Sequence, residues 1–302
     1  MSPPSLPLRA VVALLLVQLL FGLHPVAAKL AFPAFGPGGV SLARVVGAAL
    51  VFQAVRVARR EPGLPWRVHG RVLVAALFGV VANQLLFVYG LARTTATHAA
   101  LLIVMVPVVA LIVAILAGRE RFSPHRALGI VVALAGAALV VTGRGALSGG
   151  EGVGDAMVLG NAICYGIYLV LGRDLLVTIP PWTLAATLFT WAIPFVLLVT
   201  GVPMPVSPTP LAWAALASVV LGSTVGTYLL NLLALRSVPA SVVAVFVCLQ
   251  PIVAALLAIP LLDETLDART LWAGVVTVVG MLVATRGAPE ASRQGDRPVH
   301  GT

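Results

Sequence analysis

This chain has few charged residues for its length. Only 10% of its 302 residues are charged, whereas 60% are hydrophobic, and the mean hydropathy is +1.07. A soluble domain carries about 25% charged residues. With so few charges, most of the protein surface must face lipid rather than water. The composition therefore excludes an ordinary soluble domain and predicts an all-α integral membrane protein.

Several chemistries lack the residues they need. The two cysteines, Cys164 and Cys248, both lie inside apolar runs, so neither a disulfide nor a metal site follows. We find no cluster of metal ligands, no Ser-His-Asp set and no nucleotide-binding motif, so we expect no metal, no cofactor and no enzyme. No Asp or Glu lies deep in an apolar run, which disfavours a proton antiporter driven by carboxylates.

What the chain has instead is a series of apolar runs of about 20 residues, each long enough to cross a bilayer as a helix. Short breaks rich in Pro, Gly or charge separate them. We expect ten transmembrane helices, with the third and eighth interrupted by polar residues. Their predicted spans are 8–28, 37–57, 70–90, 96–117, 125–143, 153–173, 182–201, 209–232, 239–261 and 268–286.

The basic residues predict the orientation. With both termini in the cytoplasm, fourteen arginines fall on the cytoplasmic side, whereas only Lys29, Arg93, Arg144 and Arg269 fall outside. Because cytoplasmic loops carry the excess of Lys and Arg, this bias predicts a multi-pass protein of the inner (plasma) membrane with an even number of helices. The arginines lie in short loops and form no basic face, so nucleic acid is not an expected partner.

The chain also repeats itself at a constant offset of 144 residues, which indicates one duplicated unit. Matching pairs include Gly22 and Gly166, Pro107 and Pro251, Glu120 and Glu264, and Gly136 and Gly280. The first run resembles a cleaved signal peptide superficially, but it carries part of the repeat.

An odd number of helices in each unit inverts the second unit in the membrane. We therefore expect two inverted five-helix repeats, spanning 1–146 and 147–287, followed by a disordered cytoplasmic tail at 288–302. If the two units differ slightly in shape, exchanging those shapes turns an inward-open cavity into an outward-open one.

The pattern resembles the EamA-like ten-helix members of the drug/metabolite transporter superfamily. The residues that carry the resemblance are Phe21-Gly22 with Lys29, Tyr165-Gly166 with Arg173, Arg44, and the spacing from Pro107 to Glu120, repeated from Pro251 to Glu264. The resemblance implies a secondary transporter of small metabolites, often an exporter of amino acids or related compounds. The chain departs from the usual pattern at His24, where a small or amide residue is commoner.

Polar residues at helical spacing predict a central cavity. Inside lipid a polar side chain must face protein or water, and the eighth run has polar residues at i, i+3, i+4 and i+7. Hydrogen bonding between helices is the alternative, at about 0.6–2 kcal/mol a contact. The candidates are Gln18, His24, Asn83, Gln84, Asn161, Tyr165, Tyr168, Thr224, Thr227, Tyr228, Asn231 and Gln250.

Four further features have functional interpretations. His24 and His98 are candidates for proton coupling, because histidine titrates near neutral pH; the alternative is a neutral or interfacial histidine. Arg44 could bind a substrate carboxylate, or else pair with backbone carbonyls. Pro107 and Pro251 each remove a backbone hydrogen bond, which predicts helix kinks, mobile or static.

Glycines spaced by seven residues, Gly129, Gly136 and Gly143, predict close helix packing or self-association into a homodimer. Taken together, the sequence predicts a transporter of small molecules in contact with membrane lipid. A non-transporting scaffold or sensor is one alternative. A membrane enzyme acting on lipid-linked substrates is another, although it would need clustered catalytic residues.

The inverted topology gives a direct prediction. Reporter fusions at Glu120 and Glu264 should report opposite sides of the membrane, because an odd number of crossings separates the repeats. Alkaline phosphatase and green fluorescent protein fusions measure this. Equal readings at the two positions would contradict the inversion.

Overall fold

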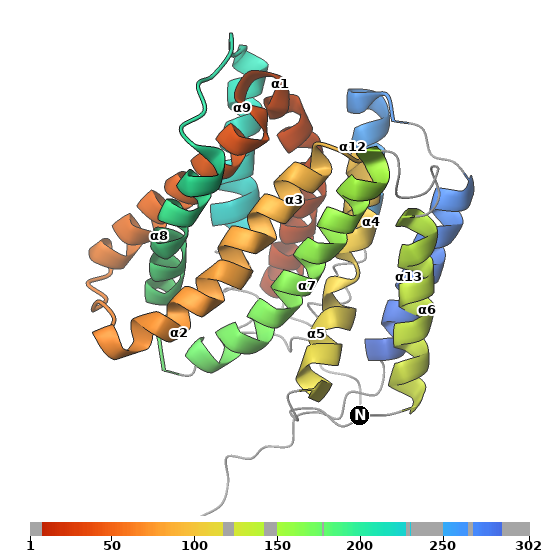
Figure 1. Ribbon diagram of the computed structural model, residues 1–302, viewed down its shortest axis with the longest axis horizontal. Helices are drawn as coiled ribbons and strands as arrows, with labels where there is room; N and C mark the ends of the chain where they lie inside the picture. Colours follow the sequence, from red (N-terminus) through yellow and green to blue (C-terminus); the bar gives the residue numbers. More distant parts are fainter. Residues whose placement is uncertain are drawn as a thin grey trace, which may run out of the picture.

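The computed structural model describes residues 8–116, 124–141, 150–176, 178–227, 230, 250–264 and 268–285, and the regular elements in these ranges are helices (Figure 1). In chain order they are α1 (Leu8–Ala58), α2 (Trp66–Ala76), η1 (Leu77–Ala82), α3 (Asn83–Leu91), α4 (Ala96–Ile103), α5 (Val106–Leu116), α6 (Pro124–Val141), α7 (Gly150–Leu176), α8 (Pro181–Thr200), α9 (Pro210–Ala217), η2 (Ser218–Gly226), α12 (Gln250–Leu262) and α13 (Ala268–Thr285).

The first two predicted spans are joined into one bent helix, α1, without an intervening loop. The bend lies at Gly36, whose φ of 62° and ψ of 168° are not helical. Glycine adopts a positive φ without the steric cost that a Cβ atom imposes. Pro33 and Pro37 flank the bend, and each lacks the backbone N–H that would continue the helical hydrogen bonds. The expected break between the spans is therefore a kink.

Four helices of the described chain are long and apolar enough to cross a membrane, namely those at Val11–Ala58, Trp66–Leu91, Ala96–Val113 and Pro181–Thr200. Shorter apolar helices lie at Ala127–Gly136, Pro210–Gly226, Gln250–Leu262 and Leu271–Gly280. The all-helical fold and the presence of several membrane-capable helices agree with the sequence prediction. Ten separate crossings stay a prediction, since much of the predicted ninth span lies outside the described residues.

The third and eighth predicted spans share a local irregularity. Each contains a π-helical segment, η1 or η2, in which the backbone hydrogen bonds span five residues instead of four. Residues 77–82 of η1 correspond at the repeat offset to 221–226, which lie within η2. Such widened turns are frequent at functional sites, because they redirect the side chains that follow.

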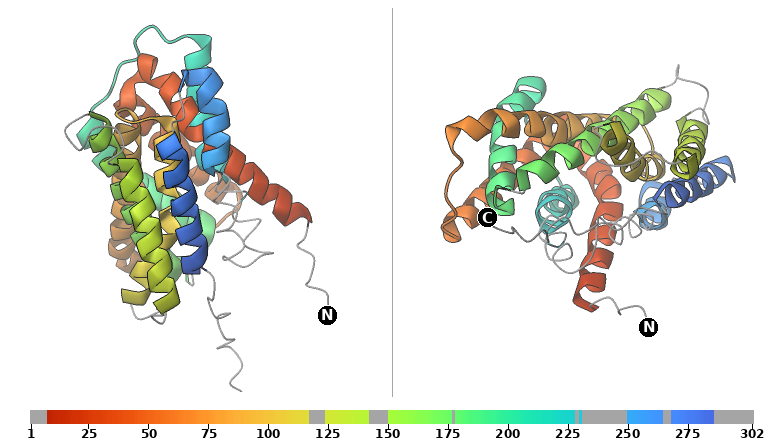
Figure 2. Two further views of the ribbon diagram at one scale, coloured as in Figure 1. Left: turned by 90° about the vertical axis from the view of Figure 1, so that its right-hand side faces the viewer. Right: turned by 90° about the horizontal axis from the view of Figure 1, so that it is seen from below.

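Glycines bring six helices into very close contact, in two pairs of matching contacts. A Cβ atom on Gly136 would lie 2.4 Å from Thr277 Oγ1, and one on Gly280 would lie 2.2 Å from the Ala133 nitrogen. These contacts pack α6 side by side with α13 (Figures 1 and 2). The two contacts are equivalent in the repeat, because the 144-residue offset pairs Gly136 with Gly280 and Ala133 with Thr277.

The second pair of contacts joins the first helix of each repeat to the other repeat. A Cβ atom on Gly22 of α1 would lie 2.5 Å from Val253 Cβ of α12, and one on Gly166 of α7 would lie 2.5 Å from Val109 Cγ1 of α5. The repeat offset again converts one contact into the other. Gly22 and Gly166 are therefore explained by close helix approach.

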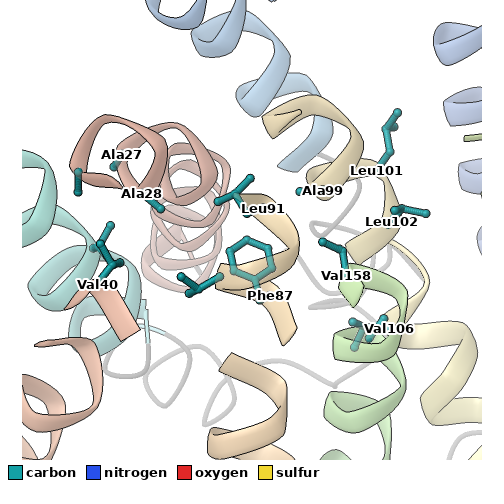
Figure 3. Packing of buried hydrophobic residues seen from close by; sticks show 14 of the residues in the cluster. Ala27, Ala28, Val40, Phe87, Leu91, Ala99, Leu101, Leu102, Val106 and Val158 are labelled. Carbon is teal, nitrogen blue, oxygen red and sulfur yellow. The ribbon is translucent and has the colours of Figure 1, made fainter. Parts of the chain in front are cut away.

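The largest apolar cluster joins both halves of the chain. It contains buried residues of α1, α3, α4 and α7, with Phe87 among Ala28, Val40 and Leu91 in Figure 3. Small side chains dominate the α1 contribution, which lets the neighbouring helices approach closely. This packing encloses the polar residues described below.

Replacing a contact glycine should weaken the α6–α13 packing. We expect Gly280→Ala to lower the free energy of unfolding by about 1–3 kcal/mol, because the new methyl group meets backbone atoms that must shift. Thermal unfolding in detergent measures the loss. Gly70→Ala is the matched control, since a Cβ atom there meets nothing within 4 Å. Equal stability of both variants would contradict the close contact.

Candidate functional site

Arg44 lies at the centre of the polar residues in the bundle interior. It is on the second limb of α1, and its side chain is only partly exposed. Its Nε donates a 2.7 Å hydrogen bond to Thr224 Oγ1 of η2, and its Nη1 donates to His24 Nε2 at 3.0 Å. Both acceptors are neutral, and no carboxylate of the described residues pairs with Arg44.

His24 is held on two sides. Its ring stacks on Phe87 with centroids 5.0 Å apart, and its side chain is buried. Because Nε2 accepts from Arg44, the neutral ring carries its proton on Nδ1. Among the described residues that Nδ1–H has no hydrogen-bond partner, and neither has the buried Ser41 Oγ, one helical turn before Arg44. Buried polar atoms without partners are rare, so this region suits a further polar ligand.

Thr224 owes its position to the π-helical turn. Its hydroxyl donates 3.0 Å to the Val219 carbonyl, five residues earlier in the chain, while accepting from Arg44. Tyr165 of α7 lies close enough to Arg44 for the two side chains to interact electrostatically. The ring centroids of Tyr165 and Tyr168 are 5.8 Å apart. The structure thus brings together residues from α1, α7 and η2.

Other predicted cavity residues bond between helices instead. Gln250 Nε2 of α12 donates to Gln18 Oε1 of α1 at 2.7 Å, and both side chains are buried. Gln84 Nε2 of α3 donates to the Ser41 carbonyl of α1 at 2.9 Å. These bonds match the alternative interpretation, in which polar residues hold the helices together.

The remaining candidates divide among packing, local bonds and positions without a described side chain. Asn161 Nδ2 donates to the Asn83 carbonyl at 2.7 Å, and the Thr227 hydroxyl donates to carbonyls of its own helix. Tyr168 fills the space beside Gly79, where a Cβ atom would lie 2.2 Å from the ring. Tyr228 and Asn231 lie outside the described residues.

Only one of the two prolines, Pro107, has several described residues on both sides. The fourth predicted span is divided into α4 and α5 just before Pro107, with a turn at Val104 and Met105. Pro251 is buried at the second residue of α12. The interruption before Pro107 agrees with a kink there, and whether either position moves stays a prediction.

His98 is buried away from the Arg44 cluster, and it has an acidic partner that the sequence analysis missed. Its Nδ1 donates to Asp155 Oδ2 of α7 at 2.9 Å, and the Thr94 hydroxyl donates to the other oxygen of the same carboxylate. Asp155 is only 2% exposed, so an acidic residue does lie inside the bundle. Its place near the start of an apolar run was visible in the sequence, but its partner was not.

Comparison with known proteins places the chain in a family. The EamA-like transporter family matches twice, at residues 8–142 and 152–286. An uncharacterized transporter of Archaeoglobus fulgidus is 30% identical over 219 residues, covering 70% of this chain and 74% of that protein. The uncharacterized transporter YyaM of Bacillus subtilis is 25% identical over 223 residues, covering 70% of this chain and 72% of that protein.

A solved crystal structure shares the fold, with a TM-score of 0.63 at 19% identity, covering 91% of this chain and 96% of the other. Two family matches over most of the chain are decisive. The chain belongs to the EamA-like transporter family, and it is therefore a multi-pass membrane transporter and not an enzyme.

The Gln18–Gln250 bond gives a prediction that separates structural from transport roles. Gln18→Leu alone should lower stability by about 0.6–2 kcal/mol, because Gln250 loses its buried partner. The double variant Gln18→Leu, Gln250→Leu should lose less than the sum of the single variants. Unfolding in detergent gives the coupling energy. Strictly additive losses would show that the two amides act independently.

Proposed function

We propose that this protein exports small carboxylate metabolites, such as amino acids, across the inner membrane by alternating access. The observation that carries the proposal is the Arg44 guanidinium, which lies inside an apolar bundle and has only neutral partners in the part of the chain that the structure describes. Placing such a charge in the membrane interior is costly unless an anion or polar groups compensate it. A substrate carboxylate would supply the missing negative charge.

The hydrogen-bonding capacity of Arg44 supports a carboxylate substrate. Contacts with the described residues use two of its five N–H groups, on Thr224 and His24, and leave three. A carboxylate accepts two parallel N–H bonds from a guanidinium. The Nδ1–H of His24, whose ring contacts Arg44, and the hydroxyl of Ser41, three residues before Arg44, also have no partner among the described residues. Together they would orient a polar substrate.

The transport cycle that we propose uses the internal repeat. Matching contacts at Gly136 and Gly280, and at Gly22 and Gly166, support two halves related by a two-fold axis in the membrane plane. The arginine distribution supports cytoplasmic termini. Exchanging the conformations of two inverted five-helix halves would then expose the Arg44 cluster first to one side and then to the other.

The energy source in this proposal is the proton gradient or the substrate's own gradient. His24 is the candidate for proton coupling within the Arg44 cluster. Protonation would remove the Nε2 lone pair that accepts from Arg44 and place two positive charges side by side. A proton on His24 would therefore favour a bound carboxylate and disfavour the empty site.

Efflux from proteoliposomes tests the substrate and the role of Arg44 together. Vesicles loaded with a mixture of radiolabelled amino acids should lose label through the protein, whereas the corresponding amino acid amides should stay inside. We expect Arg44→Gln to slow efflux by at least about tenfold, because charge-assisted hydrogen bonds to the carboxylate are lost.

Arg67→Gln is the matched control, because Arg67 is exposed at the start of α2. It removes the same charge without touching the cluster, and its efflux should equal that of the unaltered protein. Equal efflux by Arg44→Gln would contradict the proposal. Binding of the amino acids without any net flux would instead favour the sensor function.

A further inference from the structure

The first turn of α4 is held by two carboxylates that come from the other half of the chain. Asp155 lies on α7, and Glu264 follows α12. The turn itself, residues 94–98, belongs to the first half. Hydrogen bonds across this boundary must change if the two halves move against each other, so they mark a place where the transport cycle can be controlled.

Glu264 completes the N-terminal cap of α4. Its Oε1 accepts from the Ala96 nitrogen at 2.7 Å, and its Oε2 accepts from the Thr97 nitrogen at 3.2 Å and the Thr97 hydroxyl at 3.0 Å. The next N–H, that of His98, is capped by the Thr95 hydroxyl at 3.1 Å. The positive end of the helix dipole adds to the attraction for the carboxylate.

Asp155 holds the same turn from another side. It accepts from the His98 ring and from the Thr94 hydroxyl, and His98 and Asp155 are both nearly inaccessible to solvent. The first turn of α4 therefore has an acidic partner on α7 and another beyond α12. Neither partner is sequence-adjacent to α4, so the two contacts tie three separate parts of the chain together.

A cavity of about 560 Å³ opens beside this turn. Its lining includes Glu264 and Thr95, together with Lys29 and Phe32 of α1 and Leu262 of α12. The Glu264 carboxylate therefore lies between open space and the buried start of α4. Moving it away from Ala96 and Thr97 would join that space to the apolar interior around Ala99, which is fully buried one turn further along α4 (Figure 3).

We propose that Glu264 and Asp155 are gating residues, which close one end of the transport path by holding the first turn of α4 across the boundary between the halves. The proposal rests on the transport cycle proposed above, in which this end faces outward. Opening that end breaks the bonds to Ala96 and Thr97. The freed N–H groups are then hydrated by the entering water, so the gate can open without leaving them unpaired.

Cysteine labelling tests the gate without any substrate. The full chain, with Cys164→Ser and Cys248→Ser and a reporter Ala99→Cys, is reconstituted in lipid nanodiscs and labelled with a charged maleimide. Glu264→Gln places an amide NH2 against backbone donors. We expect it to increase the labelling rate about tenfold, the factor by which one hydrogen bond to a charged group changes an equilibrium.

Asp263→Asn is the matched control, because Asp263 is the exposed neighbour of Glu264 and carries the same charge at the same end. Its positive φ of 53° is also one that asparagine adopts readily. Labelling of this variant should equal that of the parent. A parental rate in Glu264→Gln, or the same increase in Asp263→Asn, would overturn the proposal.

Thr97→Val decides the question if Glu264→Gln does not give monodisperse protein. It keeps the shape of the side chain and removes one bond to Glu264, so labelling should again be faster than in the parent. An unchanged rate would overturn the gate. Because no substrate is present, faster labelling combined with unchanged efflux in Arg44→Gln would contradict the proposed substrate and leave the gate standing.

Discussion

A guanidinium inside an apolar bundle must find hydrogen-bond acceptors, and the helices around Arg44 are shaped to supply them. The π-helical turn η2 places the Thr224 hydroxyl 2.7 Å from Arg44 Nε, and the first limb of α1 provides the His24 ring. Both acceptors are neutral, so the positive charge stays available. A carboxylate fixed in the protein would stabilise a purely structural arginine more strongly. An arginine that binds an anionic ligand must not be neutralised by such a carboxylate.

The widened turns recur where the repeat predicts them. The two segments overlap at the repeat offset, which pairs Val80 of η1 with Thr224 of η2. The chemistry of the two sites nevertheless differs. Val80 is a buried apolar side chain, whereas Thr224 bonds to Arg44. The two segments thus share a π-helical backbone and differ in the polarity of the side chain at this matched position.

Periodicity and composition predicted the all-helical membrane fold and most helix bounds, because each depends on many residues at once, whereas the family was suggested by a resemblance in particular residues. Individual roles were harder, since a polar residue in an apolar run is the same in sequence whether it bonds a neighbouring helix or faces a ligand. Gln18 and Gln250 proved to be mutual partners. Asp155 was overlooked because its partner His98 is 57 residues away in the chain. The bend at Gly36 depends on its backbone dihedral angles, which the hydrophobic pattern of the sequence does not predict.

The matching glycine contacts behave in two different ways under the proposed exchange of the halves. Gly136 and Gly280 both lie in the contact between α6 and α13. If the two halves exchange conformations, each of these helices takes the place of the other, so the contact between them is unchanged. Gly22 lies in the contact of α1 with α12, and Gly166 lies in the contact of α7 with α5. The same exchange gives each of these two contacts the conformation of the other. In the proposed cycle α6 and α13 therefore keep one arrangement in both states and act as the pivot. The contacts at α1 and α7 can differ between states, and both helices carry residues of the Arg44 cluster, so opening either pair would change access to the substrate.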